Sequence, residues 1–429
     1  MAGTDGVTSS PLQGKRLLVA ASGSIAAVKT PLLVSALVRA GAEVRCLITP
    51  SASRLVSATA LASLSRHRCY QDEDQWDPAE PRPLHIALAE WADLVIVAPL
   101  SATSLARWSQ GLAEGLLAGV LIATERPVLA AAAMNTGMWR HPAVQRNWQE
   151  LQAHPRVLAL GPESGLLACD RIGDGRMADP ALIELAASSV LEQQAAGGTL
   201  SFDWSGRRLL VSAGPTREQL DPARFISNCS SGRMGVLIAQ AARLRGAEVT
   251  LVHGPLDVPH TWLEGLACHP VTSALAMEQA LGQHWPSSDA LVMAAAVADW
   301  RRRGGPSGVK LPKQQMVADL LADLEPVPDL LAGLMQTRRP GQVALGFAAL
   351  SGESSALLEQ ARSKRQAKGC DLLFANPVDR PGQGFGAVNN GGWLLLPKDR
   401  VEELPVTSKL RLAHQLLDSL IQAAIEAES

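Results

Sequence analysis

Two stretches of the chain have a pattern suited to binding a phosphate. Each reads as an apolar strand, then a turn of Gly, Ser or Thr, then an apolar helix. Ser22-Gly23-Ser24 follows the first strand, and Gly214-Pro215-Thr216 with Ser230-Ser231-Gly232 follows the second. Such a turn points backbone N–H groups at the space above the sheet, where the start of the helix favours an anion. The first turn alone is a weak signal, because Gly and Ser also form tight turns that bind nothing. Two turns of different chemistry predict two ligands and therefore two functional units.

The first half of the chain holds three further residues whose side chains could do chemistry. His85 opens an apolar segment that ends at Asp93, Asn135 follows a run of alanines, and Cys169 precedes a glycine-rich Gly-Asp-Gly-Arg sequence. Each residue also has a simple structural explanation, as a helix cap, a turn residue or a small core side chain. Considered one at a time, they leave both explanations open.

The second half concentrates polar residues around its glycine turn. Arg217, Arg224 and Asn228 lie between Gly214 and a helix expected from Arg233. Ser and Gly at a helix start, with arginines nearby, suit a polyphosphate better than a flat ring. The stretch between Asp299 and Pro328 is rich in Gly, Pro, Arg and Lys and fits neither the helical nor the strand period. We expect it to be a functional lid or a disordered loop.

The elements that must position these residues alternate between strands and helices. Strands are expected at 16–21, 43–49, 93–98, 127–132, 207–213, 247–252, 290–295, 342–347 and 371–375. This alternation predicts two α/β domains, each a doubly wound and mainly parallel sheet with helices on both faces. Pro31, which follows Thr30, is either a first-turn proline of a helix or a kink in a helix that begins at Ser24.

Length and composition limit the kind of protein. A chain of 429 residues suits two domains, and we expect a disordered N-terminus at 1–14, domains at 15–192 and 206–429, and a linker at 193–205. A net charge of −2 argues against a nucleic-acid partner. The longest apolar run, Leu116 to Met134, is interrupted by Thr124-Glu125-Arg126-Pro127, so no membrane span is expected. Six cysteines without a CxxC pair, and no export signal, favour a cytoplasmic location.

As an ordered set, the residues of the first half resemble the flavoprotein cysteine decarboxylases, in particular the phosphopantothenoylcysteine decarboxylase half of bifunctional coenzyme A biosynthesis enzymes. The resemblance covers 15–185. Its motifs are Gly23-Ser24-Ile25-Ala26-Ala27, His85-Ile86 with Trp91-Ala92-Asp93-Leu94, Pro99-x-Ser101-Ala102, Ala133-Met134-Asn135-x-x-Met138-Trp139, and Cys169 before Gly173-Asp174-Gly175-Arg176-Met177. It implies a flavodoxin-like domain that binds FMN, with Gly23, Ser24, Ser101 and Ser104 around the phosphate and Thr49 near the cofactor.

The resemblance also implies a chemistry for this half. Loss of CO₂ from a cysteine amide needs an electron sink, and oxidised flavin provides one by taking a hydride from the sulfur-bearing carbon, which leaves a thioaldehyde. His85 is implied as the base or orienting group beside that step. Asn135 is implied as the amide that grips the substrate carboxylate, and Cys169 as the acid that protonates the enethiolate while reduced flavin returns the hydride.

The second half is similar to the phosphopantothenate–cysteine ligase half of the same enzymes, to about residue 415. The matching segments are 214–228, Ala295-Ala296-Val297-Ala298-Asp299, Lys310, Pro328-Asp329-Leu330-Leu331, Gly346-Phe347-Ala348-Ala349, and a basic helix with Lys364 and Lys368. They imply a Rossmann-like domain in which the carboxylate of 4′-phosphopantothenate attacks the α-phosphate of CTP, and the amine of cysteine then displaces CMP from the acyl-cytidylate.

The resemblance assigns roles to these residues as well. Arg217, Lys310, Lys364 and Lys368 would stabilise the charge of the triphosphate. Asp299 would hold Mg²⁺ or a nucleotide group, Phe347 would pack on cytosine, and Asn228 would hold the acyl-cytidylate. The remaining expected CTP contacts are Ala295, Pro328, Asp329, Leu330 and Leu331. The chain departs from the family's usual residues at Ala132, Cys229, Arg233, Pro312 and Leu350.

The sequence therefore predicts a bifunctional enzyme that first ligates 4′-phosphopantothenate to cysteine and then decarboxylates the product to 4′-phosphopantetheine. The resemblance also implies a homo-oligomer with its sites at subunit contacts. The main alternative is a regulatory protein that binds FMN without turnover; Asn135, Cys169 and the fused second half argue against it. An NAD-linked oxidoreductase would need G-x-G-x-x-G with an acidic residue about 20 positions later, a spacing that neither turn supplies.

Overall fold

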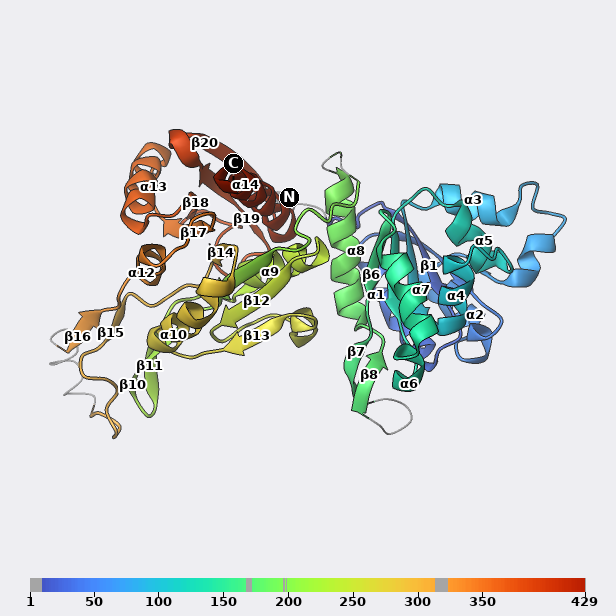
Figure 1. Cartoon of the computed structure of the whole chain (residues 1–429), viewed down its shortest axis with the longest axis horizontal. Helices are drawn as coiled ribbons and strands as arrows, with labels where there is room; N and C mark the ends of the chain where they lie inside the picture. Colours follow the sequence, from blue (N-terminus) through green and yellow to red (C-terminus); the bar gives the residue numbers. More distant parts are fainter. Residues whose placement is uncertain (1–9, 167–171, 196, 198, 313–322, 429) are drawn as a thin grey trace, which may run out of the picture. The chain divides into compact units, whose positions relative to one another are not determined.

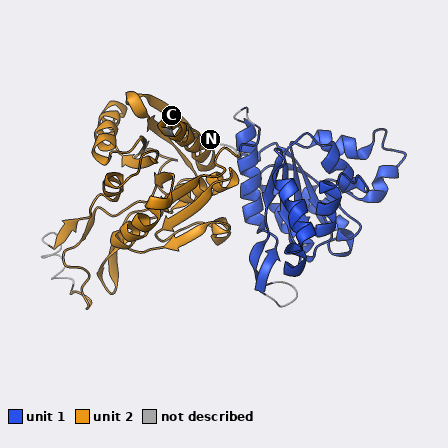
Figure 2. Cartoon of the chain, viewed as in Figure 1, with its two compact units in different colours: residues 1–201 blue, residues 202–429 orange. Residues whose placement is uncertain are grey.

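The computed structural model of the chain describes residues 10–166, 172–195, 197, 199–312 and 323–428. The chain divides into two compact units, residues 1–201 and 202–429 (Figure 2). This division falls within the segment expected to be a linker, although that segment begins inside a helix, α8 (Pro180–Ala195). Each unit has its own sheet and its own hydrophobic core.

The first unit is built on a parallel sheet with the strand order β3-β2-β1-β4-β5-β6 (Figure 1). Its strands are β1 (Arg16–Ala21), β2 (Glu43–Ile48), β3 (Cys69–Tyr70), β4 (Leu94–Leu100), β5 (Val128–Ala132) and β6 (Val157–Leu160). The order reverses between β1 and β4. At such a reversal the connecting helices leave toward opposite faces, which opens a crevice at the carboxyl ends of the strands.

Helices cover both faces of this sheet. On one face, α1 (Thr30–Arg39) contacts both α2 (Ala58–Ser65) and α8. On the other face lie α3 (Leu84–Trp91), α4 (Ala102–Ser109), α5 (Leu116–Ala123) and α7 (Pro142–Gln152). Leu18 and Ala20 of β1 point to this second face and share a core cluster with residues of these four helices. Alternate residues of one strand are therefore buried on opposite faces, as a sheet covered on both sides requires.

Two local features of the first unit bear on the expectations. The first decides between two alternatives, and the second contradicts an expectation. Ser24 caps a short 3₁₀ helix (Ile25–Lys29), and α1 begins at Thr30, so Pro31 is a first-turn proline, where no backbone N–H is needed. Residues 10–14, expected to be part of a disordered terminus, form a turn instead. Leu12 is buried there and the N–H of Gly14 donates to the carbonyl of Gly41.

The second unit has an eight-stranded sheet in the order β13-β12-β9-β14-β17-β18-β19-β20. Its strands are β9 (Arg208–Ala213), β12 (Glu248–His253), β13 (Ala267–Pro270), β14 (Ala290–Met293), β17 (Val343–Leu350), β18 (Leu372–Pro377), β19 (Asn389–Leu395) and β20 (Val401–Ser408). The first six in spatial order are parallel and the last two antiparallel. The order reverses between β9 and β14, which repeats the arrangement of the first unit.

The helices of the second unit also lie on two faces of its sheet. One face carries α9 (Arg233–Leu244) and α14 (Lys409–Glu428), which contact each other. The other carries α10 (Ala274–His284), α12 (Leu330–Gln336) and α13 (Ser354–Lys368), whose apolar residues share one core cluster with the sheet. The predicted α/β class with two mainly parallel sheets is confirmed.

Two short strand pairs extend from the second sheet (Figure 1). One is the hairpin of β10 (Arg217–Asp221) and β11 (Arg224–Ser227); the other pairs β15 (Trp300–Arg302) with β16 (Leu324–Pro326). The described ends of the stretch expected to be a lid or loop are therefore paired strands, and residues 313–322 lie outside the described part. Within that part, no helix is long and apolar enough to cross a membrane.

Candidate active sites

A cavity of about 590 Å³ lies in the first unit, at the carboxyl ends of three strands. Gly23 and Ser24 reach it from the end of β1, Ser101 from the end of β4, and Asn135 from the loop after β5. Four of the predicted residues, from three separate segments of sequence, thus line one cavity. They meet because β1 and β4 are neighbours at the point where the strand order reverses.

Buried Ser22 holds two of these loops together. Its Oγ donates to the carbonyl of Pro99 at 2.8 Å and accepts from the N–H of Ser101 at 2.7 Å. Ser101 in turn caps α4, because its Oγ accepts from the N–H of Ser104 at 3.4 Å. The start of α4 therefore faces the cavity beside the turn at Ser24, which is an arrangement suited to a phosphate group.

Glycine is required at position 23 by a close approach. A Cβ on Gly23 would lie 2.5 Å from the Cβ of Ser51, closer than side chains pack. The turn after β1 can therefore lie against the turn after β2 only without a side chain at this position.

The remaining wall of the cavity is largely apolar. Ile25, Val28, Met138 and Leu166 line it and are at least half exposed in the single chain. Leu166 comes from the hairpin of β7 (Glu163–Leu166) and β8 (Ile172–Arg176). A polar end beside an apolar wall suits a ligand that combines a phosphate with a flat ring.

The other residues predicted for the first site lie elsewhere in the chain. Thr49 and Ser104 line a separate cavity of about 30 Å³. His85, on α3, packs against Gly119 of α5 and does not line the larger cavity. Cys169 lies outside the described residues; the positions that bracket it, Leu166 and Ile172, pair across the β7–β8 hairpin.

Asn135 sits at the entrance of the larger cavity. It caps the short helix α6 (Thr136–Trp139), because its Oδ1 accepts from the N–H of Gly137 at 2.9 Å. The adjacent Met134 donates its N–H to the carbonyl of Gly175 in β8, which ties this turn to the hairpin that carries Leu166. The side chain is exposed, so a ligand can reach it.

A second cavity, of about 700 Å³, lies in the second unit at the carboxyl ends of the central strands. Most of the residues predicted for the nucleotide site line it: Asn228, Ala295, Asp299, Pro328, Asp329, Leu330, Leu331, Phe347, Lys364 and Lys368. They come from the segments that follow β11, β14 and β16, from strand β17 and from helix α13. As in the first unit, the reversal of strand order brings these segments together.

Asn228 fixes one side of this cavity. Its Nδ2 donates to the carbonyl of Val297 at 2.9 Å and to that of Ala296 at 3.3 Å. These bonds hold the segment after β14, which leads to Asp299, against the loop before α9. The amide therefore positions backbone as well as facing the cavity.

The start of α9 lies against the end of β9. Gly232, its N-cap, has φ +74°, and a Cβ there would lie 2.2 Å from Cδ2 of Leu256 and 3.1 Å from Cα of Gly214. Ser231 Oγ accepts from the N–H of Arg233 at 3.4 Å. Only glycine fits this turn, so the Ser-Ser-Gly sequence places a helix N-terminus directly at the cavity.

An ion pair also lines this cavity. Lys368 Nζ is 2.6 Å from Asp329 Oδ2, and Asp329 also caps α12 by accepting from the N–H of Ala332. Burial raises the pKa of Asp329, but the bonds from Lys368 and the α12 backbone outweigh it and hold that pKa below its ordinary value. Asp329 is therefore ionised at neutral pH and compensates one lysine of the cavity.

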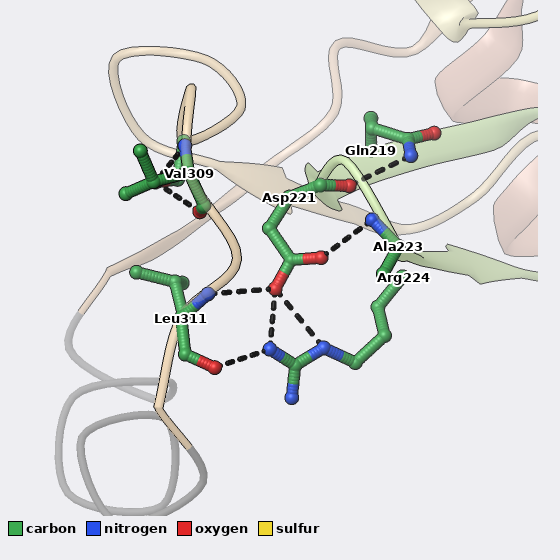
Figure 3. A network of polar contacts seen from close by, with 7 residues as sticks. Gln219, Asp221, Ala223, Arg224, Val309 and Leu311 are labelled. Carbon is green, nitrogen blue, oxygen red and sulfur yellow. Dashed lines mark hydrogen bonds and ion pairs between the residues drawn. The ribbon is translucent and has the colours of Figure 1, made fainter.

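Two residues predicted for the nucleotide site, Lys310 and Arg217, do not line this cavity. Arg217 lies on β10 with its guanidinium 4.7 Å from the ring centroid of Phe225. Lys310 is exposed and adjoins Leu311, which is held by the β10–β11 hairpin (Figure 3).

Asp221 is the centre of that attachment (Figure 3). Its Oδ2 accepts from the N–H of Leu311 at 3.1 Å, and Arg224, which pairs with the same carboxylate, donates to the carbonyl of Leu311 at 2.6 Å. The bond from Arg224, more than any other cause, lowers the pKa of Asp221 to about 2. The segment that carries Lys310 is thus anchored on a permanently charged pair.

The sequence did not predict several residues that line the second cavity. These are Arg233, Asn376, Phe385, Asn390 and Lys409. Three of them lie on or beside the antiparallel strands β19 and β20, which follow the parallel sheet in sequence and carry no glycine turn of the phosphate-binding kind. The Asn389-Asn390-Gly391-Gly392 run was the one local signal for a special site there.

Both units match known protein families. The Flavoprotein family matches residues 6–188, and the DNA/pantothenate metabolism flavoprotein C-terminal domain family matches residues 204–424. The curated coenzyme A biosynthesis bifunctional protein CoaBC of Bacillus subtilis (strain 168) is 36% identical over 95% of this chain and 97% of its own length. That of Escherichia coli (strain K12) is 38% identical over 96% and 97%.

Two solved structures are each similar to a part of the chain. The C-terminal domain of a coenzyme A biosynthesis bifunctional protein CoaBC is 32% identical and covers 53% of this chain and 100% of its own, with a TM-score of 0.42. A PPC decarboxylase variant complexed with pantothenoylaminoethenethiol is 34% identical and covers 41% and 97%, with a TM-score of 0.39. Because the curated relatives match through both units and nearly end to end, this chain belongs to the family of bifunctional coenzyme A biosynthesis proteins CoaBC.

Proposed function

We propose that the chain catalyses two consecutive steps of coenzyme A biosynthesis. The second unit joins 4′-phosphopantothenate to cysteine at the expense of CTP, and the first unit decarboxylates the product to 4′-phosphopantetheine with FMN. The chain is similar to bifunctional relatives along nearly its whole length. The observation that carries the proposal is that each of its units has a cavity at the strand-order reversal, lined by several of the residues expected there.

In the first unit the chain's own residues would bind the cofactor and orient the substrate. Ser24, Ser101 and the start of α4 would hold the phosphate of FMN, and the apolar wall would face its ring. The chemistry that bound FMN would supply here is reversible hydride transfer with the sulfur-bearing carbon of the substrate. Asn135 holds the substrate carboxylate at the cavity entrance, and Cys169 supplies the proton that replaces CO₂.

The proposed role of His85 needs a further explanation, because this residue does not line the cavity in its own chain. We propose a homo-oligomer in which a second copy of the chain covers the cavity mouth and brings its His85 to the substrate. The exposed apolar side chains at that mouth, Ile25, Val28, Met138 and Leu166, support a covering surface there.

In the second unit the residues act mainly by charge and position. Lys364 and Lys368 stabilise the triphosphate, Phe347 packs on cytosine, and Asn228 holds the acyl-cytidylate while the cysteine amine attacks. Lys310 and Arg217 lie outside the cavity, on a region whose exposed Phe225 and Val309 support a contact with a second copy. We propose that this contact delivers both cations to the triphosphate.

Mg²⁺ would enter this site with CTP. Among the described residues no group of three or more His, Cys, Asp or Glu side chains could hold a metal. Mg²⁺ is commonly bound by one or two carboxylates together with substrate phosphates, and Asp299 fits that requirement. Five described cysteines are free, which suits the reducing cytoplasm as the compartment.

One incubation tests the two activities together. The purified protein is mixed with 4′-phosphopantothenate, cysteine, CTP and Mg²⁺, and CMP and CO₂ are followed in time. We expect a yellow protein and stoichiometric CMP and CO₂, with CMP but no CO₂ from Cys169→Ser and neither from Lys310→Gln. A colourless protein that FMN does not reconstitute, or CO₂ release at the normal rate by Cys169→Ser, would contradict the assignment.

A mixing experiment tests the shared site. His85→Ala and Asn135→Ala are each expected to be inactive in CO₂ release, whereas mixed oligomers restore part of the activity because some sites combine two intact residues. Failure to restore any activity in verified mixed oligomers would refute the second-copy proposal. A regulatory FMN-binding protein without turnover is not favoured, because the family match extends through the ligase unit.

A further inference from the structure

Lys409 is an unusual residue of the second cavity. Of the six charged side chains among the described residues that line it, Arg233, Asp299, Asp329, Lys364, Lys368 and Lys409, only Lys409 is buried, with 4% exposure. It is the first residue of α14 and reaches the cavity from the far end of the sequence. A charge removed from water in this way is costly unless it is paired.

No carboxylate compensates this charge in the part of the chain that the structure describes. The Nζ of Lys409 donates to the carbonyl of Gly384 at 3.0 Å, and it takes part in no ion pair there. An ammonium group has three donors, so one carbonyl leaves most of its bonding capacity for another group. The side chain faces a cavity large enough for a ligand.

A second cation faces the same place. Arg233, the first residue of α9, is close enough that its charge, after burial, helps to lower the pKa of Lys409 to about 8. Arg233 also forms no ion pair within the described residues; its guanidinium lies 5.6 Å from the ring centroid of Trp262. Arg233 begins α9 and Lys409 begins α14, so each cation lies at the end of its helix where the helix dipole favours an anion. The two charges also repel each other unless an anion lies between them.

The charges of the whole cavity support the same conclusion. The described residues of its lining include four cations and two carboxylates, and Lys368 is already paired with Asp329. Among these described residues, only Asp299 then remains to balance Arg233, Lys364 and Lys409. Neither Arg233 nor Lys409 forms an ion pair with a carboxylate among the described residues.

We propose that Lys409 and Arg233 form an oxyanion-binding subsite for a phosphate-containing substrate of the second unit. The ligand is either the polyphosphate of the nucleotide or the phosphomonoester of the acyl substrate, which share the same chemistry. The proposal rests on the ligase function proposed above. It adds to that function a buried ammonium and a guanidinium that act together with the α9 N-terminus.

A purely structural role for Lys409 makes a different prediction. Its backbone N–H donates to the carbonyl of Val388 and its Nζ to that of Gly384, so the residue also holds the 384–388 loop. If this were its whole role, replacing it would lower stability and would change the KM values of all substrates together. An anion subsite instead predicts an effect confined to one phosphate-bearing substrate.

The test compares Lys409→Met and Arg233→Met with Arg411→Met, an exposed cation on the first turn of the same helix α14. CMP formation is measured with CTP, 4′-phosphopantothenate and cysteine varied in turn. We expect Lys409→Met and Arg233→Met to raise one phosphate substrate's KM about 10- to 100-fold, as loss of a charged hydrogen bond would. The KM for cysteine should not change, and Arg411→Met should behave as the unmodified chain.

The substrate whose KM rises identifies the ligand. A higher KM for CTP assigns the subsite to the polyphosphate, and a higher KM for 4′-phosphopantothenate assigns it to the phosphomonoester. Unchanged KM values for both, or equal increases for all three substrates with a lower melting temperature, would overturn the proposal.

A binding measurement separates this proposal from the ligase function. Inorganic pyrophosphate and inorganic phosphate are each titrated against the full chain, and the melting temperature of the second unit is recorded. We expect one of them to stabilise the unmodified chain and Arg411→Met but not Lys409→Met or Arg233→Met. If no CMP forms but this difference is seen, the ligase proposal fails and the subsite remains; if both anions stabilise all four proteins equally, the subsite is refuted.

Discussion

Replacing Gly235 with alanine should separate the two units functionally. Gly235 lies in the first turn of α9, which begins at the second cavity, and it is buried against the end of β9. A Cβ at this position would lie 2.6 Å from the Cβ of Ala213 and 2.9 Å from the carbonyl oxygen of Ser212. These are a small side chain and a backbone atom, so neither can rotate away, and the helix itself must move.

The size of the effect follows from this distance. The approach is about 0.8 Å shorter than an ordinary contact of 3.4 Å. Overpacking of this kind costs about 1–3 kcal/mol, and the better helix propensity of alanine returns up to about 1 kcal/mol. A net loss of about 1–2 kcal/mol lowers the melting temperature of a unit of this size by about 2–8 °C.

The displaced helix should also impair the ligase reaction. A shift approaching 1 Å at Arg233 and Ser231 misplaces the groups that face the substrate, and such a shift lowers rates by up to about 100-fold. The first unit does not contain this helix, so its CO₂ release from supplied 4′-phosphopantothenoylcysteine should keep the normal rate. Calorimetry with separate CMP and CO₂ assays measures all three quantities.

Gly282→Ala is the matched control. Gly282 lies in α10 of the same unit, and a Cβ there would meet no atom within 4 Å. Alanine should therefore leave both activities unchanged and stabilise the unit by about 0.5–1 kcal/mol. If Gly235→Ala melts at the normal temperature and forms CMP at the normal rate, the argument from close helix–strand packing is refuted.

Three further predictions concern other parts of the chain. Gly23→Ala should sharply lower the FMN content of the purified protein, because its Cβ meets Ser51, whereas Gly161→Ala, with open space around it, should bind FMN normally; equal flavin absorbance would contradict this. Asp221→Asn should lower CMP formation about tenfold by releasing the segment next to Lys310, with CO₂ release from supplied substrate unchanged; an unchanged CMP rate would refute the anchoring role. Burial, and secondly Arg245, lower the pKa of His414 to about 3, so the unfolded chain takes up the proton first as pH falls below 6.5. The free energy of unfolding of the second unit should therefore fall by about 1.4 kcal/mol per pH unit between pH 6.5 and 4 because of this residue. His414→Gln should flatten the profile of melting temperature against pH in that range.

The central elements of both sheets could be predicted from local sequence. All nine expected strands are present within a few residues, because parallel strands covered on both faces are continuous apolar runs bounded by turns. The glycine turns after β1 and β9 could also be predicted from the local sequence. Glycine is required there because a Cβ on Gly23 or Gly232 would lie too close to atoms of a neighbouring segment.

The edge strands were not predictable in the same way. β3 and β13 are short, and β19 and β20 form an antiparallel pair whose alternation is weak: in β20 only Leu404 is buried. Their stability comes from pairing with an already formed sheet, so their own sequences carry little of the signal.

The sequence by itself determined the α/β class, the two units and the segments that would follow the central strands, because strand period, helix period and glycine turns are local properties. Only the tertiary structure decided which polar residues share a cavity. It brought Lys409 beside Arg233, 176 positions earlier in the chain, and it left His85 and Lys310 outside the cavities of their own units. The physical reason is that contacts at a strand-order reversal depend on strand pairing, which no single segment encodes.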